Sequence, residues 1–272
     1  MNEDKHTQIV TIRAVSKVFE SADSSTLALN NINLDICKGE FVSLIGPSGC
    51  GKSTLLRLIG DLLSPTTGEI TINGKNPKQA RLDRDYGIVF QTPVLFDWRN
   101  VRKNVTLPLE VFKETKEFSQ EKASKMLSLV ELNDFENHHP WQLSGGMQQR
   151  VSIARALSFE PALLLMDEPF GALDEMTRER MNMLLLDIWE KTKTTIIFVT
   201  HSIPEAVFLS TRVVIMSPRP GQIEDIVKID LAHPRDIYTR ENEQYFRDVS
   251  HIREKLRFTG ATEEPASSEE FR

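Results

Sequence analysis

Apolar and polar side chains alternate along much of the first third of the chain. Residues 9–19 and 28–36 alternate in this way, which is typical of strands with one buried face. Residues 41–45 form a continuous apolar run that leads directly into a glycine-rich segment, and residues 52–59 then have a helical pattern. Another strand is predicted at residues 69–72, which end at the turn dipeptide Asn73-Gly74. The order strand, glycine-rich loop, helix therefore lies in the amino-terminal part of the chain.

The middle of the chain alternates helical and strand-like segments. Apolar positions predict helices within residues 101–139, 144–159 and 178–192, and apolar runs predict strands at residues 163–166 and 195–200. Short apolar strands that alternate with helices are typical of a parallel sheet covered on both faces. We therefore expect an α/β fold.

The last part of the chain is predicted to close the domain. We expect strands at residues 213–216 and 223–229, a rigid turn at 217–221 between them, and a final helix at about 241–256. Residues 259–272 are polar and acidic, and this composition predicts a disordered tail. The folded domain is thus expected to span residues 1–258.

The composition is that of an ordinary globular protein. The 272 residues carry a formal net charge of −6, which does not favour nucleic-acid binding, because such proteins are normally basic. The polar start lacks the apolar stretch of a secretory signal, and no apolar run approaches the ~18 residues of a membrane span. Only two cysteines occur, Cys37 and Cys50. We therefore expect a soluble protein of the cytosol.

The glycine-rich segment has the pattern of a phosphate loop, GxxxxGK[ST]. Its glycines let backbone N–H groups face phosphate oxygens, and the helix that begins near Lys52 adds the positive end of its dipole. Lys52 supplies a cation for the β and γ phosphates, and the Ser53 hydroxyl suits Mg²⁺. Kinases, GTPases and motor ATPases share the pattern, so it predicts a nucleotide site without naming the reaction. The segment is Gly46-Pro47-Ser48-Gly49-Cys50-Gly51-Lys52-Ser53-Thr54.

Two carboxylates, Asp167 and Glu168, directly follow the strand predicted at residues 163–166. A parallel neighbour of the phosphate-loop strand would bring them to the same edge of the sheet. Asp167 is then suited to the Mg²⁺ shell, and Glu168 can accept a proton from an attacking water. The alternative interpretation is an acidic pair that stabilises the dipole of the next helix.

The segment Leu143-Ser144-Gly145-Gly146-Met147-Gln148-Gln149-Arg150 opens the helix predicted at residues 144–159. Taken alone, it is an ordinary helix start that Ser144 caps, with exposed first-turn N–H groups that suit an anion. Because it lies between a phosphate loop and an acidic strand, the segment is more informative about the protein family than a helix cap alone would be.

With these motifs in this order, the chain resembles the ATPases of ABC transporters over nearly its whole length, up to the last helix. The resemblance implies a P-loop NTPase fold with a parallel core sheet, an N-terminal antiparallel β-subdomain and an α-helical signature subdomain at about residues 92–160. It also implies an ABC signature at residues 143–150. Asp167 and Glu168 match the Walker B aspartate and the catalytic glutamate.

The resemblance implies roles for four more residues. These are adenine stacking for Phe19, contact with Mg²⁺ and sensing of a membrane partner for Gln91, a D-loop position for Asp174, and a switch function for His201. Two copies would pair head to tail as a homodimer, with ATP between one phosphate loop and the partner's Ser144, Gly145 and Gly146. Glu168 would polarise water while His201 holds the γ-phosphate.

The region after Gln91 resembles that of a narrower group, the importers of nitrate, sulfonates, taurine and related small molecules. Residues 94–101 and 216–221 carry this resemblance. It implies integral-membrane permease subunits as partners at the cytoplasmic face of the membrane, with Phe96 and Trp98 as anchors, and indirectly an extracytoplasmic solute-binding protein. An exporter-type or non-transport ABC ATPase is the alternative function. A monomeric phosphate-loop kinase is not favoured, because it would have no use for the signature. The solute of an importer could also be a small heterocycle. A metal site at His138-His139 would need further ligands.

Overall fold

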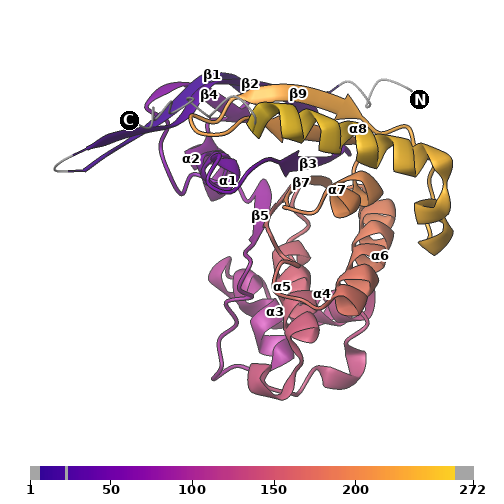
Figure 1. Cartoon of the computed structure of the whole chain (residues 1–272). Coiled ribbons are helices and arrows are strands. Elements are labelled where there is room, and N and C mark those ends of the chain that lie inside the picture. Colours follow the sequence, from indigo (N-terminus) through magenta and orange to yellow (C-terminus); the bar gives the residue numbers. More distant parts are fainter. Residues whose placement is uncertain (1–6, 22–23, 261–272) are drawn as a thin grey trace, which may run out of the picture.

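The chain builds two β-sheets and a separate group of helices in the computed structural model, which describes residues 7–21 and 24–260 (Figure 1). The smaller sheet is antiparallel and has the order β2 (Ser25–Cys37), β1 (Gln8–Glu20), β4 (Thr67–Ile72). The larger sheet has the order β5 (Tyr86–Val89), β6 (Leu163–Asp167), β7 (Thr195–Val199), β3 (Phe41–Ile45), β8 (Arg212–Met216), β9 (Ile223–Lys228).

The larger sheet is parallel except for its last strand. β3 lies in the middle, paired in parallel with β7 on one side and β8 on the other, and β9 runs antiparallel to β8. The carboxyl end of β6 reaches Asp167, which stands opposite Val199 of β7. Because Leu44 of β3 also pairs with Val199, the carboxyl ends of β3, β6 and β7 meet at one edge.

Side chains on the two faces of the parallel sheet enter two different hydrophobic cores. Along β6, Leu163 and Leu165 pack with the antiparallel sheet and α1 (Lys52–Ile59), whereas Leu164 and Met166 pack with the helices on the opposite face. All five residues of the strand are buried. The continuous apolar run predicted at residues 163–166 is thus the pattern of a strand covered on both faces.

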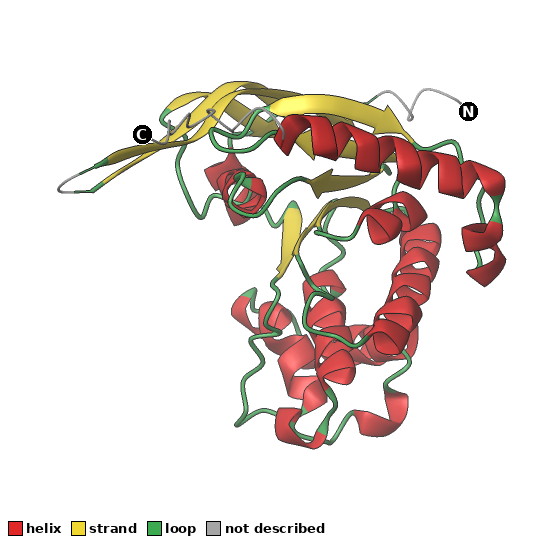
Figure 2. Cartoon of the chain, in the orientation of Figure 1, coloured by secondary structure: helices red, strands yellow, loops and turns green. Residues whose placement is uncertain are grey.

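The helices from α3 onward divide into two groups. One group covers the parallel sheet: α6 (Glu175–Thr192), α7 (Ile203–Leu209) and α8 (Glu243–Gly260). The other forms a subdomain away from the strands, at the bottom of Figure 2: α3 (Val101–Val111), α4 (Lys116–Leu129) and α5 (Gly145–Leu157). A short helix α2 (Pro77–Leu82) follows β4. No helix within the described ranges is long and apolar enough to cross a membrane.

This architecture confirms the expected fold class, with a parallel core sheet, an antiparallel β-sheet near the amino end and a helical subdomain. Some predicted bounds were wrong. The stretch predicted as helical over residues 101–139 breaks between α3 and α4 at Lys113, whose φ of 60° lies in the left-handed region, and again after α4 at Glu131. α6 begins at Glu175 rather than residue 178, because Asp174 caps it by accepting from the backbone N–H of Thr177.

The end of the chain differs from its prediction in a similar way. The last helix, α8, starts at Glu243 after a short 3₁₀ helix (Ile237–Glu241) and runs to Gly260, beyond the predicted end of the domain. Most of the tail predicted to be disordered, from residue 261 onward, lies outside the described residues.

Candidate active site

The phosphate loop connects the carboxyl end of β3 to the first turn of α1, in the order the sequence predicts. Gly51 caps α1 with a φ of 105°, a conformation that L side chains rarely adopt. A Cβ atom at Gly51 would also lie 2.6 Å from a methyl carbon of Leu29. The loop therefore needs glycine here both for its backbone conformation and for its close packing against β2.

Lys52 is buried beneath the phosphate loop and is only 4% exposed. Its ammonium group donates to the carbonyl oxygens of Gly46 at 2.8 Å and Pro47 at 2.9 Å. A buried cation is costly unless such partners satisfy it. The loop thus holds one positive charge at the carboxyl edge of the sheet. There the ammonium group can leave the backbone carbonyls and contact the phosphates of a ligand.

Ser53 of the phosphate loop and Asp167 at the end of β6 lie side by side in the structure. The hydroxyl of Ser53 donates to Oδ1 of Asp167 at 2.6 Å, and a guanidinium nitrogen of Arg57 lies 4.0 Å from Oδ2. A hydroxyl and a carboxylate oxygen side by side are ligands that a hard cation such as Mg²⁺ prefers. The donor set therefore fits the metal that the sequence predicts here.

Glu168 lies in the turn that directly follows β6, and its backbone conformation differs from that of the strand. Its φ is 47°, in the left-handed region. Its N–H donates to the carbonyl of Val199 at 3.1 Å, and its own carbonyl accepts from Gly171 at 3.1 Å. The carboxylate lies 2.5 Å from Nε2 of His201, which follows β7. Two residues that are far apart in sequence, Glu168 and His201, thus form one acid–base pair at the sheet edge.

A cavity of about 490 Å³ opens above these groups. Phe19 at the end of β1, which is 40% exposed, lies at this cavity, as do most of the predicted phosphate-loop residues. Three lining residues were not predicted: Thr26 and Ala28 from β2, and Arg219 from the turn between β8 and β9. The complete lining is Phe19, Thr26, Ala28, Ser48, Gly49, Gly51, Lys52, Ser53, Thr54, Glu168, His201 and Arg219.

Some predicted site residues do not line the cavity of their own chain. In the phosphate loop, Gly46 and Cys50 are buried, and Pro47 contributes a carbonyl to Lys52. Gln91 is exposed beyond β5 and lies close to Glu168, because a methyl group placed on Gly171 would be 3.5 Å from Nε2 of Gln91 and 3.8 Å from Oε2 of Glu168.

The signature segment stands apart, at the start of α5 in the helical subdomain. Ser144 caps the helix by accepting from the N–H of Met147 at 3.3 Å, as predicted, and Gly145 and Gly146 form its first turn. A Cβ at Gly146 would lie 2.8 Å from a methyl of Thr177 on α6. Asp174 is exposed as the cap of α6, and hydrogen bonds from Thr177 lower the pKa of its carboxyl group. Within the residues described, Ser144, Gly145 and Gly146 do not line the cavity at the phosphate loop.

α5 nevertheless holds the segment that follows β5. The buried side chain of Gln149 donates to the carbonyl of Phe90 at 3.1 Å, directly before Gln91. Arg155 donates to the carbonyls of Pro93 and Val94, both at 2.8 Å. The signature helix and the segment around Gln91 are thus connected by three side-chain hydrogen bonds.

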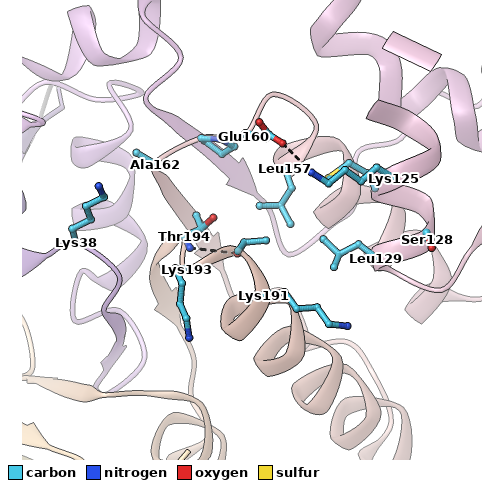
Figure 3. Close-up of a pocket in the computed structure, with 13 residues that line it drawn as sticks. Lys38, Lys125, Ser128, Leu129, Leu157, Glu160, Ala162, Lys191, Lys193 and Thr194 are labelled. Carbon is cyan, nitrogen blue, oxygen red and sulfur yellow. Dashed lines mark hydrogen bonds and ion pairs between the residues drawn. The ribbon is translucent and has the colours of Figure 1, made fainter. Parts of the chain in front are cut away.

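A different cavity, of about 810 Å³, lies at the amino ends of β6 and β7 (Figure 3). It is lined mainly by aliphatic side chains and by four lysines, of which Lys125 lies 3.4 Å from Glu160 and Lys191 lies 2.5 Å from Asp187. It lies at the opposite edge of the sheet from Asp167 and contains none of the predicted site residues. We therefore place the chemistry at the smaller cavity.

The pair His138-His139 has structural partners of its own. The ring of His139 stacks on Trp141 with 4.4 Å between centroids, and its Nδ1 lies 3.0 Å from the carbonyl of Asp97. Within the described ranges, no group of three or more histidine, cysteine, aspartate or glutamate side chains could hold a metal ion. The ring of His138 packs against Phe135 with 5.2 Å between centroids, so the structure gives both imidazoles packing partners and gives His139 a hydrogen bond as well.

Comparison with known proteins places these observations in a family. The sequence profile of the ABC transporter family matches residues 29–171. An uncharacterized ABC transporter ATP-binding protein of Methanocaldococcus jannaschii is 48% identical over 241 residues, which cover 89% of this chain and 90% of the relative. An aliphatic sulfonates import ATP-binding protein of Bacillus thuringiensis is 44% identical over 227 residues, covering 84% and 88% of the two chains.

Solved structures show the same relationship. The ATP-binding cassette MJ0796, as a dimer in a post-hydrolysis state bound to ADP and Pi, superposes with a TM-score of 0.71 at 39% identity, covering 81% of this chain and 98% of that one. The protein cbiO1 of Clostridium perfringens, part of the transporter complex cbiONQ, superposes with a TM-score of 0.75 at 25% identity over 95% of this chain and all of that one.

Proposed function

The chain belongs to the ABC transporter family and is an ATP hydrolase of that type, and from this premise we propose that it powers an importer of a small solute of the nitrate, sulfonate or taurine kind. One observation carries the hydrolytic part. Lys52, the Ser53–Asp167 pair and the Glu168–His201 pair converge at a single edge of the parallel sheet. The likeness to a sulfonate import protein over most of the chain supports the importer.

We assign each converging side chain one task in hydrolysis. Phe19 stacks on the adenine, and Lys52 turns from its two carbonyls toward the phosphates. Glu168 accepts the proton of the attacking water, and His201 holds the terminal phosphate. Ser53, Asp167 and Gln91 would hold Mg²⁺, which neutralises phosphate charge when bound. The carboxylate of Glu168 and the imidazole of His201 are already in contact. The residue that accepts the proton and the residue that holds the phosphate are therefore positioned relative to each other before ATP binds.

We propose that two copies assemble head to tail. The signature residues Ser144, Gly145 and Gly146 do not line the cavity of their own chain, within the part of the chain described. The first N–H groups of α5 have no acceptor one turn earlier in the helix, and such groups suit an anion. A second copy would bring these groups to the phosphates, so that loss of the γ-phosphate removes a contact that holds the dimer closed. The dimeric cassette among the structural neighbours supports this arrangement.

The surface proposed for the permease lies around Trp98. This side chain is 76% exposed and stacks on Phe96 with 4.7 Å between ring centroids. A cavity of about 680 Å³ beside Trp98 is lined by residues of α3, of α4 and of the connection between them, among them Thr106, Gln120 and Glu114. An exposed aromatic anchor next to a cleft is a typical protein–protein contact. A short helix of a permease would fit this surface.

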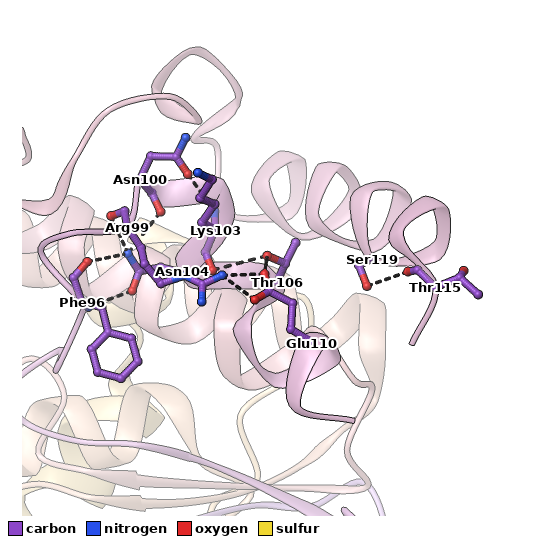
Figure 4. Close-up of polar contacts among 9 residues, drawn as sticks. All are labelled: Phe96, Arg99, Asn100, Lys103, Asn104, Thr106, Glu110, Thr115 and Ser119. Atoms are coloured by element: carbon purple, nitrogen blue, oxygen red, sulfur yellow. Dashed lines mark hydrogen bonds and ion pairs between the residues drawn. The ribbon is translucent and has the colours of Figure 1, made fainter. Parts of the chain in front are cut away.

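A buried asparagine fixes the segment that carries Trp98 (Figure 4). Oδ1 of Asn104 accepts from the N–H of Phe96 at 2.9 Å. Its Nδ2 donates to the carbonyls of Phe96, Arg99 and Asn100 at 2.9–3.1 Å. α5 holds the segment before Trp98 through the hydrogen bond from Gln149 to the carbonyl of Phe90. A displacement of Trp98 would therefore be transmitted to Gln91 and the signature helix. We propose that this route couples the permease to ATP hydrolysis.

The Trp98→Ala variant is expected to bind and hydrolyse ATP normally as an isolated protein but to lose most of its affinity for the permease. An aromatic anchor at an interface contributes about 2 kcal/mol or more, which is roughly a thirtyfold change in affinity. Binding of the purified subunit to permease in detergent would measure it. Tyr238→Ala, which removes an aromatic side chain that is 66% exposed and lies outside the cavity beside Trp98, is the control. Equal loss in both variants, or in neither, would contradict the assigned surface.

The Asn104→Ala variant is expected to lower the free energy of unfolding by about 1–3 kcal/mol, because the fully buried side chain of Asn104 makes four hydrogen bonds to the backbone of residues 96–100 that the variant loses. It should also weaken permease binding, since Trp98 is no longer held in place, while ATP binding persists. Chemical denaturation and the same binding assay measure both effects. Val111→Ala, an exposed change at the other end of the same helix that does not line the cavity beside Trp98, should alter neither. Unchanged stability in Asn104→Ala would show that the hydrogen bonds do not fix this segment.

Uptake by cells tests the transport function. Cells that lack this chain are expected to lose uptake of at least one labelled compound among an alkanesulfonate, taurine and nitrate. The unmodified gene should restore uptake, and Glu168→Gln should not. Retained uptake of all three compounds, combined with ATP hydrolysis by the purified protein, would leave the ATPase in place and overturn the proposed solute class.

A further inference from the structure

The turn between β8 and β9, residues 217–222, is docked onto the phosphate loop. The N–H of Gly221 donates to the carbonyl of Ala28 on β2, and the carbonyl of Gly221 accepts from Asn30, both at 2.9 Å. A Cβ atom at Gly221 would lie 1.9 Å from the carbonyl oxygen of Cys50. Only glycine therefore allows this turn to approach the backbone of the phosphate loop so closely.

The turn is also braced from within. The N–H of Ser217 donates to the carbonyl of Gln222 at 3.0 Å, and the N–H of Gln222 donates back to the Ser217 hydroxyl at 3.0 Å. The same hydroxyl lies 3.1 Å from the carbonyl oxygen of Pro218 and donates to it. A turn closed by these bonds and flanked by prolines holds the residue at its tip, Arg219, in one place.

Arg219 projects from this turn into the nucleotide cavity. One guanidinium nitrogen, Nη2, donates to the carbonyl of Gly49 in the phosphate loop at 3.4 Å. The side chain lines the cavity together with Lys52 and His201 and is exposed. Within the described residues, no carboxylate lies within ion-pair distance of it, whereas Arg212 on the same hairpin pairs with Glu40 at 2.7 Å. Most of the five N–H donors of Arg219 are therefore free for a ligand.

We propose that Arg219 is a second cationic contact for the phosphates of ATP. Lys52 reaches the phosphates from beneath the loop, and Arg219 reaches them from its outer side. The guanidinium presents several donors in one plane, a geometry that suits phosphate oxygens. Its bond to Gly49 also ties it to the loop that surrounds those oxygens. This inference rests on the proposed ATP site and adds to it a residue from the carboxyl-terminal part of the chain.

Nucleotide binding to the isolated, dilute protein tests the contact, because a single chain then provides every contact. Arg219→Ala is expected to weaken ATP binding about tenfold, the effect of losing one charge-assisted hydrogen bond. Arg219→Lys should recover part of the loss, and Arg219→Glu should bind more weakly than Arg219→Ala because it repels the phosphates. Arg253→Ala removes an exposed arginine on α8 and is the control. The unfolding temperature without nucleotide is measured for every variant.

Each other outcome overturns a distinct part of the argument. Equal ATP affinity in all variants would exclude the contact. Weaker binding with a lower unfolding temperature and no recovery by lysine would make Arg219 a brace for Gly49 only. Normal affinity in the isolated chain, with loss of the dimer in the Glu168→Gln background, would assign Arg219 to the partner subunit instead. If the unmodified protein itself fails to bind ATP, the proposed function fails, and the inference fails with it.

Discussion

Replacing Glu168 with glutamine is expected to lower ATP turnover by roughly 10²–10⁴-fold while ATP binding persists, because the change removes the group that accepts a proton from water. The amide keeps an oxygen that can accept from Nε2 of His201, so the contact at 2.5 Å can persist and the turn after β6 should not change. With hydrolysis blocked, ATP stays between the two copies and the dimer should accumulate. Steady-state turnover and size-exclusion chromatography in ATP and Mg²⁺ measure the two effects.

Glu224→Gln is the matched control for this experiment. Glu224 is an exposed carboxylate on β9, and its replacement should leave turnover and assembly unchanged. A Glu168→Gln protein that hydrolyses ATP at the normal rate and stays monomeric would contradict the assignment of Glu168 as the proton acceptor. It would also remove the main reason for a dimer held together by ATP.

Replacing Lys52 with methionine is expected to lower the catalytic efficiency of ATP hydrolysis by roughly 10²–10³-fold, the usual loss when one preorganised donor to developing charge is removed. Methionine matches the length of the buried stem, so the packing under the loop is retained. The change leaves the carbonyl of Gly46 without the lysine donor, whereas the carbonyl of Pro47 still accepts from the N–H of Cys50 at 3.3 Å, and the change also removes a buried charge. We therefore expect a small change in the unfolding temperature, in contrast to the large loss of catalytic efficiency, which includes weaker ATP binding.

Steady-state turnover at varied ATP concentrations, calorimetric titration with ATP and thermal unfolding without it separate these effects. Lys78→Met changes an exposed lysine on α2 and should behave as the unmodified protein does. If Lys52→Met unfolds many degrees earlier, the lysine acts mainly as a structural support of the loop. If it binds ATP with unchanged affinity, the cation assigned to the phosphates must come from elsewhere in the cavity.

The strands and the phosphate-loop helix could be predicted because their signals are local. Residues 41–45 and 52–59 are bounded on both sides by turn or glycine residues, and the structure confirms both ends of β3 and α1. Helix bounds elsewhere depended on single side chains. The first buried residue of α6 is Met181, and Met176 in the first turn is exposed, so the start at Glu175 follows from the cap by Asp174 rather than from periodicity.

The site itself was only partly predictable from the residues. The pairing of Ser53 with Asp167 follows from the rule that parallel strands bring their carboxyl ends together. Arg219 could not be found in this way. It stands in a turn with the ordinary proline and glycine composition of a connection, and its place beside Gly49 depends on hydrogen bonds between residues nearly 200 positions apart. Such contacts leave no local pattern in a sequence.

The position of β3 in the middle of the parallel sheet has a consequence for the order in which the protein can fold during synthesis. Its two hydrogen-bonding neighbours, β7 and β8, begin only at Thr195 and Arg212. The phosphate-loop strand therefore leaves the ribosome with both edges unpaired, a state that is prone to mispairing. A nascent chain stopped before Thr195 would contain the whole phosphate-loop motif without the sheet that shapes it. We expect ATP binding to arise late in translation, after the turn that carries Gly221 has emerged.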